Sequence, residues 1–364
     1  SLWQRTGSEF LNGWVEVPSH PMPELSSIMA QDIFQKDISD RKPGRKTYIR
    51  AMPTRQLHIT AGNTPEVPII SALRCILTKS AGVIKLPFGA IITGSLLEIA
   101  AVHAEPDHPI TRNLSLVYWE GGDRNIERSL FSSQAFDRVV VWGSLETVAA
   151  VKAGSPLTDV ISFNPRYGVS MIGKEAFAEN IEETAVKAST DSLIYNQKSC
   201  TASLVHYIEG SQEQAEAYAE ALCRSLAKWD GAVPQFLPPV ITGAVKRLRR
   251  GMYGAGKWYF NRRDGEFTSG AVVMPDDFSI LDHPMCRLVI VRPVKSLGEA
   301  LKYIDRNVST VGIYPEKRRS EMRNAVLARG VSNVFPLGEC DRLYTGMPHD
   351  GAAVLSRLVD WKNA

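Results

Sequence analysis

The sequence lacks several features that would assign it to a class at once. Its five cysteines are odd in number and never form a C-x-x-C pair, which argues against a disulfide framework and a zinc cage. The 42 basic and 39 acidic side chains leave a net charge of +3, so no strong field indicates nucleic acid as a partner. No apolar run approaches the roughly 20 residues that a membrane helix needs. We therefore expect a cytoplasmic protein with no metal site and no membrane span.

The chain has the length and composition of a globular protein with two domains. Of its 364 residues, 44% are hydrophobic and 22% are charged. Short apolar runs alternate with amphipathic stretches, and the alternation predicts strands at 56–60, 82–86, 114–119, 138–142 and 160–163, and helices at 66–77, 93–103, 125–134 and 145–153. Continuous apolar strands separated by helices predict an α/β fold with a parallel sheet that helices cover on both faces.

Polar and glycine-rich segments follow three of these predicted strands. Gly62-Asn63-Thr64-Pro65 follows the first, Lys85-Leu86-Pro87 the second, and Gly143-Ser144 the fourth. Such sheets bind ligands at the carboxyl ends of their strands, and a helix N-terminus favours a pyrophosphate, so these segments are candidates for nucleotide binding. Each also has a simpler interpretation, as an N-cap or a turn. The G-x-G-x-x-G fingerprint of ordinary dinucleotide folds is absent.

Cys200 stands in a polar turn between a predicted helix at 175–193 and a predicted strand at 204–208. A cysteine at such a junction is held on rigid elements yet exposed, which suits a nucleophile whose pKa is lowered by backbone N–H groups or cations. The alternative is a buried structural cysteine. The polar neighbours Gln197, Lys198 and Ser199 favour the nucleophile.

The rest of the chain predicts a second α/β domain at residues 191–343. Its expected strands are 204–208, 287–292 and 311–314, and its expected helices are 212–229, 297–307 and 316–329. The dinucleotide-binding domain would then comprise residues 1–190, with residues 344–364 packing back on the body of the protein.

Taken together, these segments resemble the aldehyde dehydrogenase superfamily and, within it, the bacterial luminescence-type long-chain acyl-CoA reductases. The resemblance covers residues 56 to 351, and Gly346-Met347-Pro348-His349-Asp350-Gly351 resembles the terminal Pro-x-x-Gly segment of the family. It implies that Cys200 is the nucleophile and that Asn63 donates to the oxyanion. It also implies that the cofactor binds Lys85 and Pro87 after the second strand and Gly143 and Ser144 after the fourth.

Two departures from the superfamily bear on the reaction. The Glu of the Glu-Leu-Gly-Gly segment, which activates water, has no carboxylate counterpart in residues 161–168, so a thioester intermediate would persist and accept a hydride. Phe88 stands where many NAD-dependent relatives carry a Glu that holds the ribose hydroxyls. Loss of that carboxylate removes its repulsion of a 2'-phosphate and favours NADPH. The Glu-x-Phe-Gly-Pro loop of the family is not visible, and Asp282-His283-Pro284 occupies roughly its place.

The resemblance therefore implies an NADPH-dependent reduction of a fatty acyl thioester, with coenzyme A as part of the substrate, to the aldehyde through a Cys200 acyl-enzyme. It also implies a homodimer or homotetramer, and acyl-activating partner subunits are further candidates. Three alternatives stay open: a CoA-acylating aldehyde dehydrogenase that uses NAD, a reductase of carrier-protein-bound acyl groups, and an inactive scaffold subunit.

Three other polar features have weaker interpretations. His349 beside Asp350 is a candidate proton donor, and a turn capped by Asp is the alternative. His206 has the pattern of a core histidine. The basic run at 246–250 has the pattern of an exposed helix face rather than a site for coenzyme A phosphates.

Overall fold

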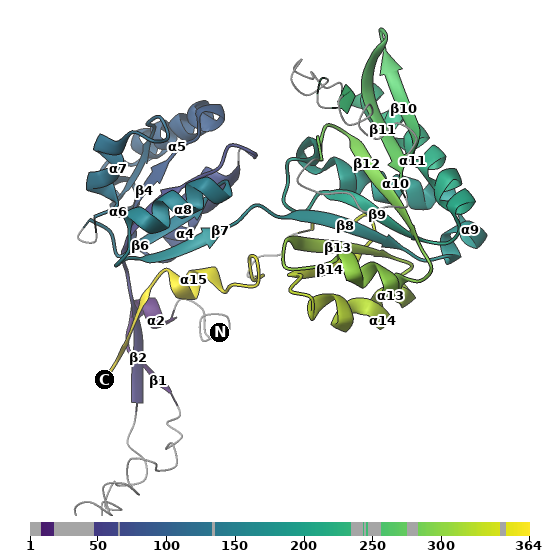
Figure 1. Ribbon diagram of the computed structural model, residues 1–364. Coiled ribbons are helices and arrows are strands. Elements are labelled where there is room, and N and C mark those ends of the chain that lie inside the picture. The colour runs from purple at the N-terminus through teal and green to yellow at the C-terminus, as the bar shows by residue number, and fades with distance from the viewer. Residues whose placement is uncertain are drawn as a thin grey trace, which may run out of the picture. The chain divides into compact units, whose positions relative to one another are not determined.

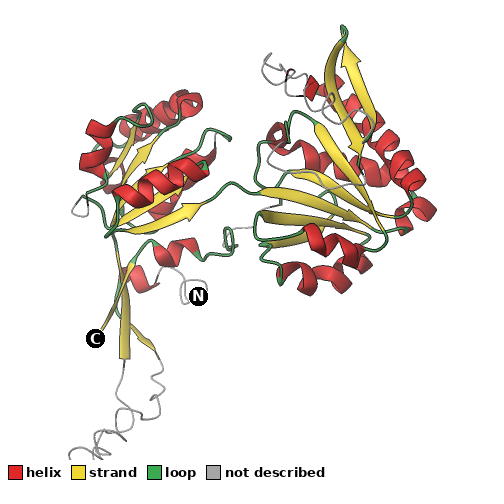
Figure 2. Ribbon diagram, in the orientation of Figure 1, coloured by secondary structure: helices red, strands yellow, loops and turns green. Residues whose placement is uncertain are grey.

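The computed structural model describes residues 9–17, 47–64, 66–132, 135–233, 243, 245–246, 256–274, 283–342 and 347–364. They belong to two compact units (Figures 1 and 2). The first unit comprises Ser1–Ser162 and Ala353–Ala364, and the second comprises Phe163–Ala352. Among the described residues, no helix has the length and apolar character needed to cross a membrane.

The first unit is built on a five-stranded sheet in the order β5-β4-β3-β6-β7. Strand β3 pairs in parallel with β4 and β6, and β4 pairs in parallel with β5. The strands are β3 (Arg55–Ile59), β4 (Ala81–Lys85), β5 (Leu114–Val117), β6 (Arg138–Trp142) and β7 (Asp159–Phe163). All five predicted strands are therefore present, with ends that differ by at most two residues.

Helices cover both faces of this sheet. Alternate residues of a strand point to opposite faces, so both faces carry apolar side chains that helices bury. Ile84 and Leu116 pack with Ala72 of α4 (Glu66–Leu77) and Leu97 of α5 (Ile91–Ala104) on one face. On the other face, Val139 and its neighbours pack with α8 (Leu145–Gly154) and with Leu130 of α7 (Arg124–Leu130). The short α6 (Pro109–Arg112) precedes β5. The predicted α/β architecture is confirmed.

A small antiparallel sheet completes the first unit. Its order is β1-β2-β15, with β1 (Val15–Val17), β2 (Thr47–Met52) and β15 (Asp360–Asn363). The short helices α2 (Glu9–Asn12) and α15 (Val354–Arg357) accompany it. The ring of Phe10 on α2 lies edge-on to that of Trp361 on β15, 5.4 Å between centroids. Thus residues 353–364 return to the first unit.

The second unit contains a seven-stranded sheet in the order β10-β11-β12-β9-β8-β13-β14. Neighbours pair in parallel except β10, which is antiparallel to β11. The strands are β8 (Tyr167–Ile172), β9 (Ser203–Glu209), β10 (Lys257–Arg263), β11 (Glu266–Val273), β12 (Leu288–Val294), β13 (Val308–Tyr314) and β14 (Asn333–Pro336).

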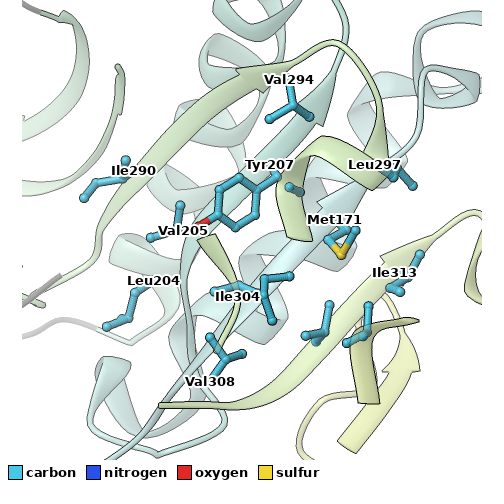
Figure 3. Packing of buried hydrophobic residues seen from close by; sticks show 14 of the residues in the cluster. Met171, Leu204, Val205, Tyr207, Ile290, Val294, Leu297, Ile304, Val308 and Ile313 are labelled. Carbon is cyan, nitrogen blue, oxygen red and sulfur yellow. The ribbon is translucent and has the colours of Figure 1, made fainter. Parts of the chain in front are cut away.

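The core of the second unit lies on both faces of this sheet. Helices α10 (Ile181–Leu193) and α11 (Gln212–Ala232) pack on one face. The other face is covered by α13 (Leu297–Ala300), the 3-10 turn η4 (Leu301–Tyr303) and α14 (Glu316–Leu327). Figure 3 shows the core on this second face, to which Met171, Val205, Ile290 and Leu297 belong.

The boundary between the units differs from the predicted division at residues 190 and 191. Strand β8 pairs with β9 and β13 in the middle of the second sheet, so residues 163–190 belong to the second unit. Likewise, residues up to 352 belong to the second unit and only 353–364 return to the first. The helix predicted at 175–193 is two helices, α9 (Glu175–Glu179) and α10, because Asn180 ends the first and caps the second by accepting from Glu183 N.

Candidate active site

The predicted site residues of the first unit lie at the carboxyl ends of neighbouring strands. Of the predicted cofactor residues, Lys85 ends β4, and Gly143 and Ser144 follow β6. Asn63, the predicted oxyanion donor, follows β3. Because β4, β3 and β6 are neighbours and parallel, their carboxyl ends lie side by side. The segments that follow β3 and β4 also approach closely, since a Cβ added at Gly62 would lie 3.2 Å from the Cβ of Pro87. The structure therefore groups these candidates on a single edge.

Lys85 is held among aromatic rings at this edge. Its Nζ lies 5.6 Å from the ring centroid of Trp119 and 5.9 Å from that of Tyr118, within the range of cation–π contacts. Burial lowers the pKa of Lys85. Phe88, which replaces the expected acidic residue, is 81% exposed. The negative charge of Glu127, which also accepts from Trp119 Nε1, acts on the pKa of Lys85 in the direction opposite to burial. A cation beside the open surface of Phe88 can approach an anionic ligand.

Ser144 is the N-cap of α8. Its Oγ accepts a hydrogen bond from Thr147 N at 3.3 Å, and Gly143 lies directly before it. A Cβ at Gly143 would come within 3.1 Å of the Thr147 side chain. Glu146 stands in the first turn, and its hydrogen bond with Ser144 lowers the pKa of its carboxyl. The other first-turn N–H groups remain suited to an anion.

Cys200 lies between the 3-10 turn η2 (Ile194–Gln197) and β9 in the second unit. Tyr195, Asn196 and Gln197 all have positive φ, at 47°, 57° and 66°. A second run, residues 285–287, has φ values of 58°, 58° and 60°. Side chains rarely adopt this backbone region, and such residues persist where surrounding contacts hold them, often at functional sites.

The two runs are tied to each other. Gln197 Nε2 donates to Leu288 O at 2.7 Å, and Arg287 Nε donates to Asn196 Oδ1 at 2.7 Å. The same guanidinium pairs with Asp230 at 2.7 Å and donates to Val233 O at 2.7 Å. This buried ion pair joins α11, β12 and the segment before Cys200. The turn that carries Cys200 is therefore fixed from one side.

Strands β8 and β13 fix the turn from the other side. Ser309 Oγ donates to the carbonyl oxygen of Cys200, and Gly168 N donates to Ala202 O at 2.8 Å. A Cβ added at Gly168 would lie 2.2 Å from the carbonyl oxygen of Thr201. Only glycine allows β8 and the turn to approach this closely.

A cavity of about 540 Å³ opens beside Cys200. Its lining includes Arg287 before β12, Ser309 in β13 and Asn333 in β14, together with His349 and Asp350. Because β9, β12, β13 and β14 are parallel, the cavity lies at the amino ends of these strands. Its volume falls within the usual range for small-molecule sites.

Arg166 anchors the segment that carries His349 and Asp350. Its guanidinium pairs with Asp350 at 3.1 Å and donates to Ser332 Oγ at 2.6 Å. It also donates to Val308 O at 2.8 Å and Gly330 O at 2.9 Å. The His349 ring lies edge-on to Phe163 at 4.9 Å. The predicted terminal motif is thus placed at the cavity, although its Gly346, like Pro65 of the Asn63 segment, lies outside the described residues.

The thiol of Cys200 is not activated as the sequence predicted. Burial raises its pKa to about 11, and the negative charge of Asp350 adds to the rise. Arg166 and Ser199 act in the opposite direction but do not compensate. The expectation of a lowered pKa is wrong because the turn packs against β13 and the Asp350 segment. At neutral pH the resting group is the thiol.

Asn63 is exposed in the first unit, whereas Cys200 belongs to the second, so the oxyanion role of Asn63 stays a prediction.

His206 is a core histidine, as its pattern indicated. Its Nε2 lies 2.9 Å from Ser192 Oγ and its Nδ1 lies 2.8 Å from Tyr218 OH, and burial lowers its pKa to about 3.

The two other weaker candidates are only partly described. Lys246 pairs with Glu266 at 3.4 Å, and 247–250 lie outside the described residues. In the Asp282-His283-Pro284 segment, His283 is buried, and residue 282 lies outside the described residues.

Two arginines of the site were missed by sequence reasoning. Arg166 lies in the segment at 161–168, of which only the missing carboxylate was interpreted from the sequence. Arg287 is the first residue of the strand predicted at 287–292, where no motif marks it. The structure also places the carboxylate of Asp350 at the cavity, whereas residues 161–168 contain no carboxylate. Within the described ranges, no group of three His, Cys, Asp or Glu side chains is arranged to hold a metal ion.

Comparisons with known proteins identify the family of the chain. A family model described as acyl-CoA reductase (LuxC) matches residues 22–361. The chain is 26% identical over 356 residues to the long-chain acyl-protein thioester reductase of Photorhabdus laumondii subsp. laumondii, covering 96% of this chain and 72% of that protein. It is 27% identical over 359 residues to the enzyme of the same name from Aliivibrio fischeri, with 95% and 71% covered.

Solved structures identify the fold. An oxidoreductase from Marinobacter aquaeolei matches with a TM-score of 0.72 at 13% identity, covering 96% of this chain and 73% of that one. An aldehyde dehydrogenase from Brucella melitensis biovar abortus 2308 also matches with a TM-score of 0.72 at 13% identity, covering 97% and 72%. The fold is therefore aldehyde dehydrogenase-like, as the sequence predicted.

Proposed function

The chain belongs to the acyl-CoA reductase (LuxC) family, and on that premise we propose that it reduces a fatty acyl thioester to the aldehyde through an acyl group held on Cys200. The observation that carries the proposal is the position of Cys200. Its turn is fixed from both sides by Arg287 and Ser309, and its side chain lines a cavity large enough for an organic substrate. Covalent catalysis by a cysteine needs this combination of rigid support and access.

In the first step the sulfur of Cys200 attacks the carbonyl carbon of the thioester. The bond from that carbon to the donor sulfur breaks, and the donor leaves as a thiol with the proton that Cys200 gives up. The Asn63 amide and the Cys200 backbone N–H are the proposed oxyanion donors. Because the resting thiol has a raised pKa, its proton must pass to a base or to the leaving sulfur as the bond forms.

A nicotinamide nucleotide, NADPH on the evidence of Phe88, is the proposed cofactor. The residues at the sheet edge of the first unit fit it: Lys85 offers a cation toward the ribose and phosphate, with Pro87 beside it. Gly143 and Ser144 open α8, a helix of 10 residues, toward a pyrophosphate. When bound, the cofactor would supply a hydride to the acyl carbon. The bond from that carbon to the Cys200 sulfur then breaks, the aldehyde leaves, and the sulfur takes up a proton to return to the thiol.

The donor is proposed to be a long-chain acyl thioester on a protein or on coenzyme A. The relatives from Photorhabdus and Aliivibrio are named as reductases of acyl-protein thioesters, which supports a protein-bound donor and an acyl-activating partner. The family description supports coenzyme A. A homodimer or homotetramer in the cytoplasm stays part of the proposal.

Intact-mass spectrometry tests the proposal. The protein is incubated with tetradecanoyl-CoA or a tetradecanoylated carrier protein, and NADPH or NADH is then added. We expect an acyl adduct on Cys200 that disappears with NADPH and gives the aldehyde, and no adduct in Cys200→Ala. Asn63→Ala should slow turnover by about 10²- to 10³-fold.

Other outcomes select the alternatives. Preference for NAD and aldehyde oxidation would indicate the CoA-acylating dehydrogenase, and an adduct from the carrier protein alone would indicate the carrier-linked reductase. No adduct with any donor would contradict an acyl-transfer function and leave the scaffold subunit.

A further inference from the structure

The order of the strands divides the cavity beside Cys200 into two sides. In the sheet, β12 and β9 are neighbours on one side of β8, and β13 and β14 lie on the other. Arg287 precedes β12, and Cys200 precedes β9. Ser309 and Asn333 lie at the beginnings of β13 and β14. Along this row of strand beginnings, Arg287 therefore lies on one side of Cys200, and Ser309 and Asn333 lie on the other.

The apolar part of the lining comes from the helices on one face of the sheet. Trp229 and Val233 lie at the end of α11, which packs on β11 and β12 on the side of Arg287, and Leu193 and Ile194 lie at the end of α10 and the start of η2. Asn196 adds a polar group beside them, and its amide oxygen accepts from Arg287. Helices α10 and α11 pack against each other, and Arg287 holds the end of α11 to this side through Asp230 and Val233 O. Trp229 is fixed by a hydrogen bond from its indole N–H to Ser189 Oγ at 3.2 Å. The result is an apolar wall with a defined shape.

Arg287 does not make this wall polar. All three nitrogens of its guanidinium donate to protein acceptors, and its charge is paired with Asp230. Only 5% of the Arg287 side chain is exposed. A buried, fully paired arginine contributes its aliphatic stem to its surroundings more than its charge.

The opposite side of the cavity is polar. Ser309, Asn333, His349 and Asp350 line it, and Arg166 fixes the last of these. Hydroxyl, amide and carboxylate groups suit the polar amides of a thiol carrier rather than a hydrocarbon chain, because a polar group left without a partner in an apolar site is costly. The two ends of an acyl thioester thus have different chemical surroundings on either side of Cys200.

We infer that the acyl chain lies along the wall of Leu193, Trp229 and Val233, and that the donor thiol departs on the side of Ser309 and Asn333. The inference rests on the proposed function of Cys200 and adds the residues that select the chain. Each methylene placed on an apolar wall raises affinity about fourfold, so Trp229 and Val233 determine the preference for long chains.

A pair of matched valines tests the inference. Val233 lines the cavity and is 53% exposed, whereas Val186 on α10 is 45% exposed and does not line it. Val233→Trp should fill the outer end of the wall and lower kcat/KM for a tetradecanoyl thioester by about tenfold or more, with butanoyl thioester changed less than about twofold. Val186→Trp should leave both substrates unchanged. Equal losses for both substrates, or no loss, in Val233→Trp would overturn the inference.

A second pair keeps the test decisive if Val233→Trp folds poorly. Trp229→Ala should flatten the rise of log kcat/KM with chain length, because the wall loses its largest surface, and Trp229→Phe should restore most of the slope. An unchanged slope in Trp229→Ala overturns the inference. Mass spectrometry of the butanoyl adduct on Cys200 distinguishes failure of this inference from failure of the proposed function. If the adduct forms but neither variant alters chain preference, only the inference fails, and if no donor gives an adduct, the proposed function fails with it.

Discussion

Gly168 offers a direct test of how tightly the turn that carries Cys200 must be held. A Cβ at this position would lie 2.2 Å from Thr201 O, 2.8 Å from Thr201 C and 2.9 Å from Ala202 O. All three are backbone atoms within two residues of Cys200. Since β8 is hydrogen-bonded on both sides, to β9 and β13, the strand cannot move away freely. In Gly168→Ala the turn must give way instead.

The size of the effect follows from these distances. An ordinary contact of this kind is 3.4 Å or longer, so the Thr201 carbonyl must move by about 1 Å. A displacement of this size at reacting atoms costs about 10²-fold in rate. Forcing an extra carbon into packed structure costs about 1–3 kcal/mol of the free energy of unfolding. We therefore expect kcat to fall about a hundredfold while the protein stays folded.

Single-turnover reduction of a preformed acyl thioester, followed together with thermal unfolding, measures both effects. Gly298→Ala is the matched control, because a Cβ there meets only Ser296 Oγ at 3.6 Å. It should leave kcat and Tm nearly unchanged. If Gly168→Ala turned over within about threefold of the wild-type rate, the close approach would have no bearing on catalysis.

A change of pH and two substitutions, Asp350→Asn and Arg287→Lys, test the charge around Cys200 and the positioning of its turn. Alkylation of Cys200 by iodoacetamide should accelerate about tenfold for each pH unit between about 7 and 10, because the thiolate is the reactive form and the pKa is about 11. Asp350→Asn removes the charge that adds to this pKa, so alkylation at pH 8 should be about three- to tenfold faster. Asp341→Asn in the same cavity is the control, and an unchanged or slower rate in Asp350→Asn would contradict the assignment. Arg287→Lys keeps a cation near Asp230 but loses the fork that reaches Asn196 and Val233 O, so kcat should fall about 10- to 100-fold with little change in KM. Arg262→Lys, at an exposed position of β10, should not alter kcat. A matching loss there would show that the effect is not specific to the site.

Local patterns predicted the five-stranded sheet of the first unit and its longer helices well, but not the small sheet of β1, β2 and β15. The helix at 66–77 and the strand at 138–142 have the predicted bounds. Periodicity failed where pairing partners are distant. Strand β8 begins with Tyr167 and Gly168 and contains Ser170, so its sequence does not read as a buried strand. The β10–β11 hairpin was also missed, because its pairing depends on a turn and on the neighbouring β12.

The residues of the candidate site also fall into those that local sequence signals predict and those that depend on distant partners. Cys200 and the segments after β3, β4 and β6 carry their own signals, because a nucleophile turn and a helix N-cap are local structures. Arg166 and Arg287 act through backbone carbonyls and carboxylates that the fold brings from other elements. The direction of the Cys200 pKa was wrong for the same reason, since burial comes from packing between distant segments.

The route of the chain has a consequence for the order in which the protein is made. The second unit is one continuous segment, but the first unit needs residues that come before it and residues that come after it in the chain. Thr54 Oγ1 and Gln56 Nε2 both donate to Leu358 O, at 2.6 Å and 3.0 Å, and β2 pairs with β15. Until the ribosome has added residues 353–364, buried polar groups of the first unit lack their acceptor. The unit encoded second is therefore the first that can complete its structure during synthesis.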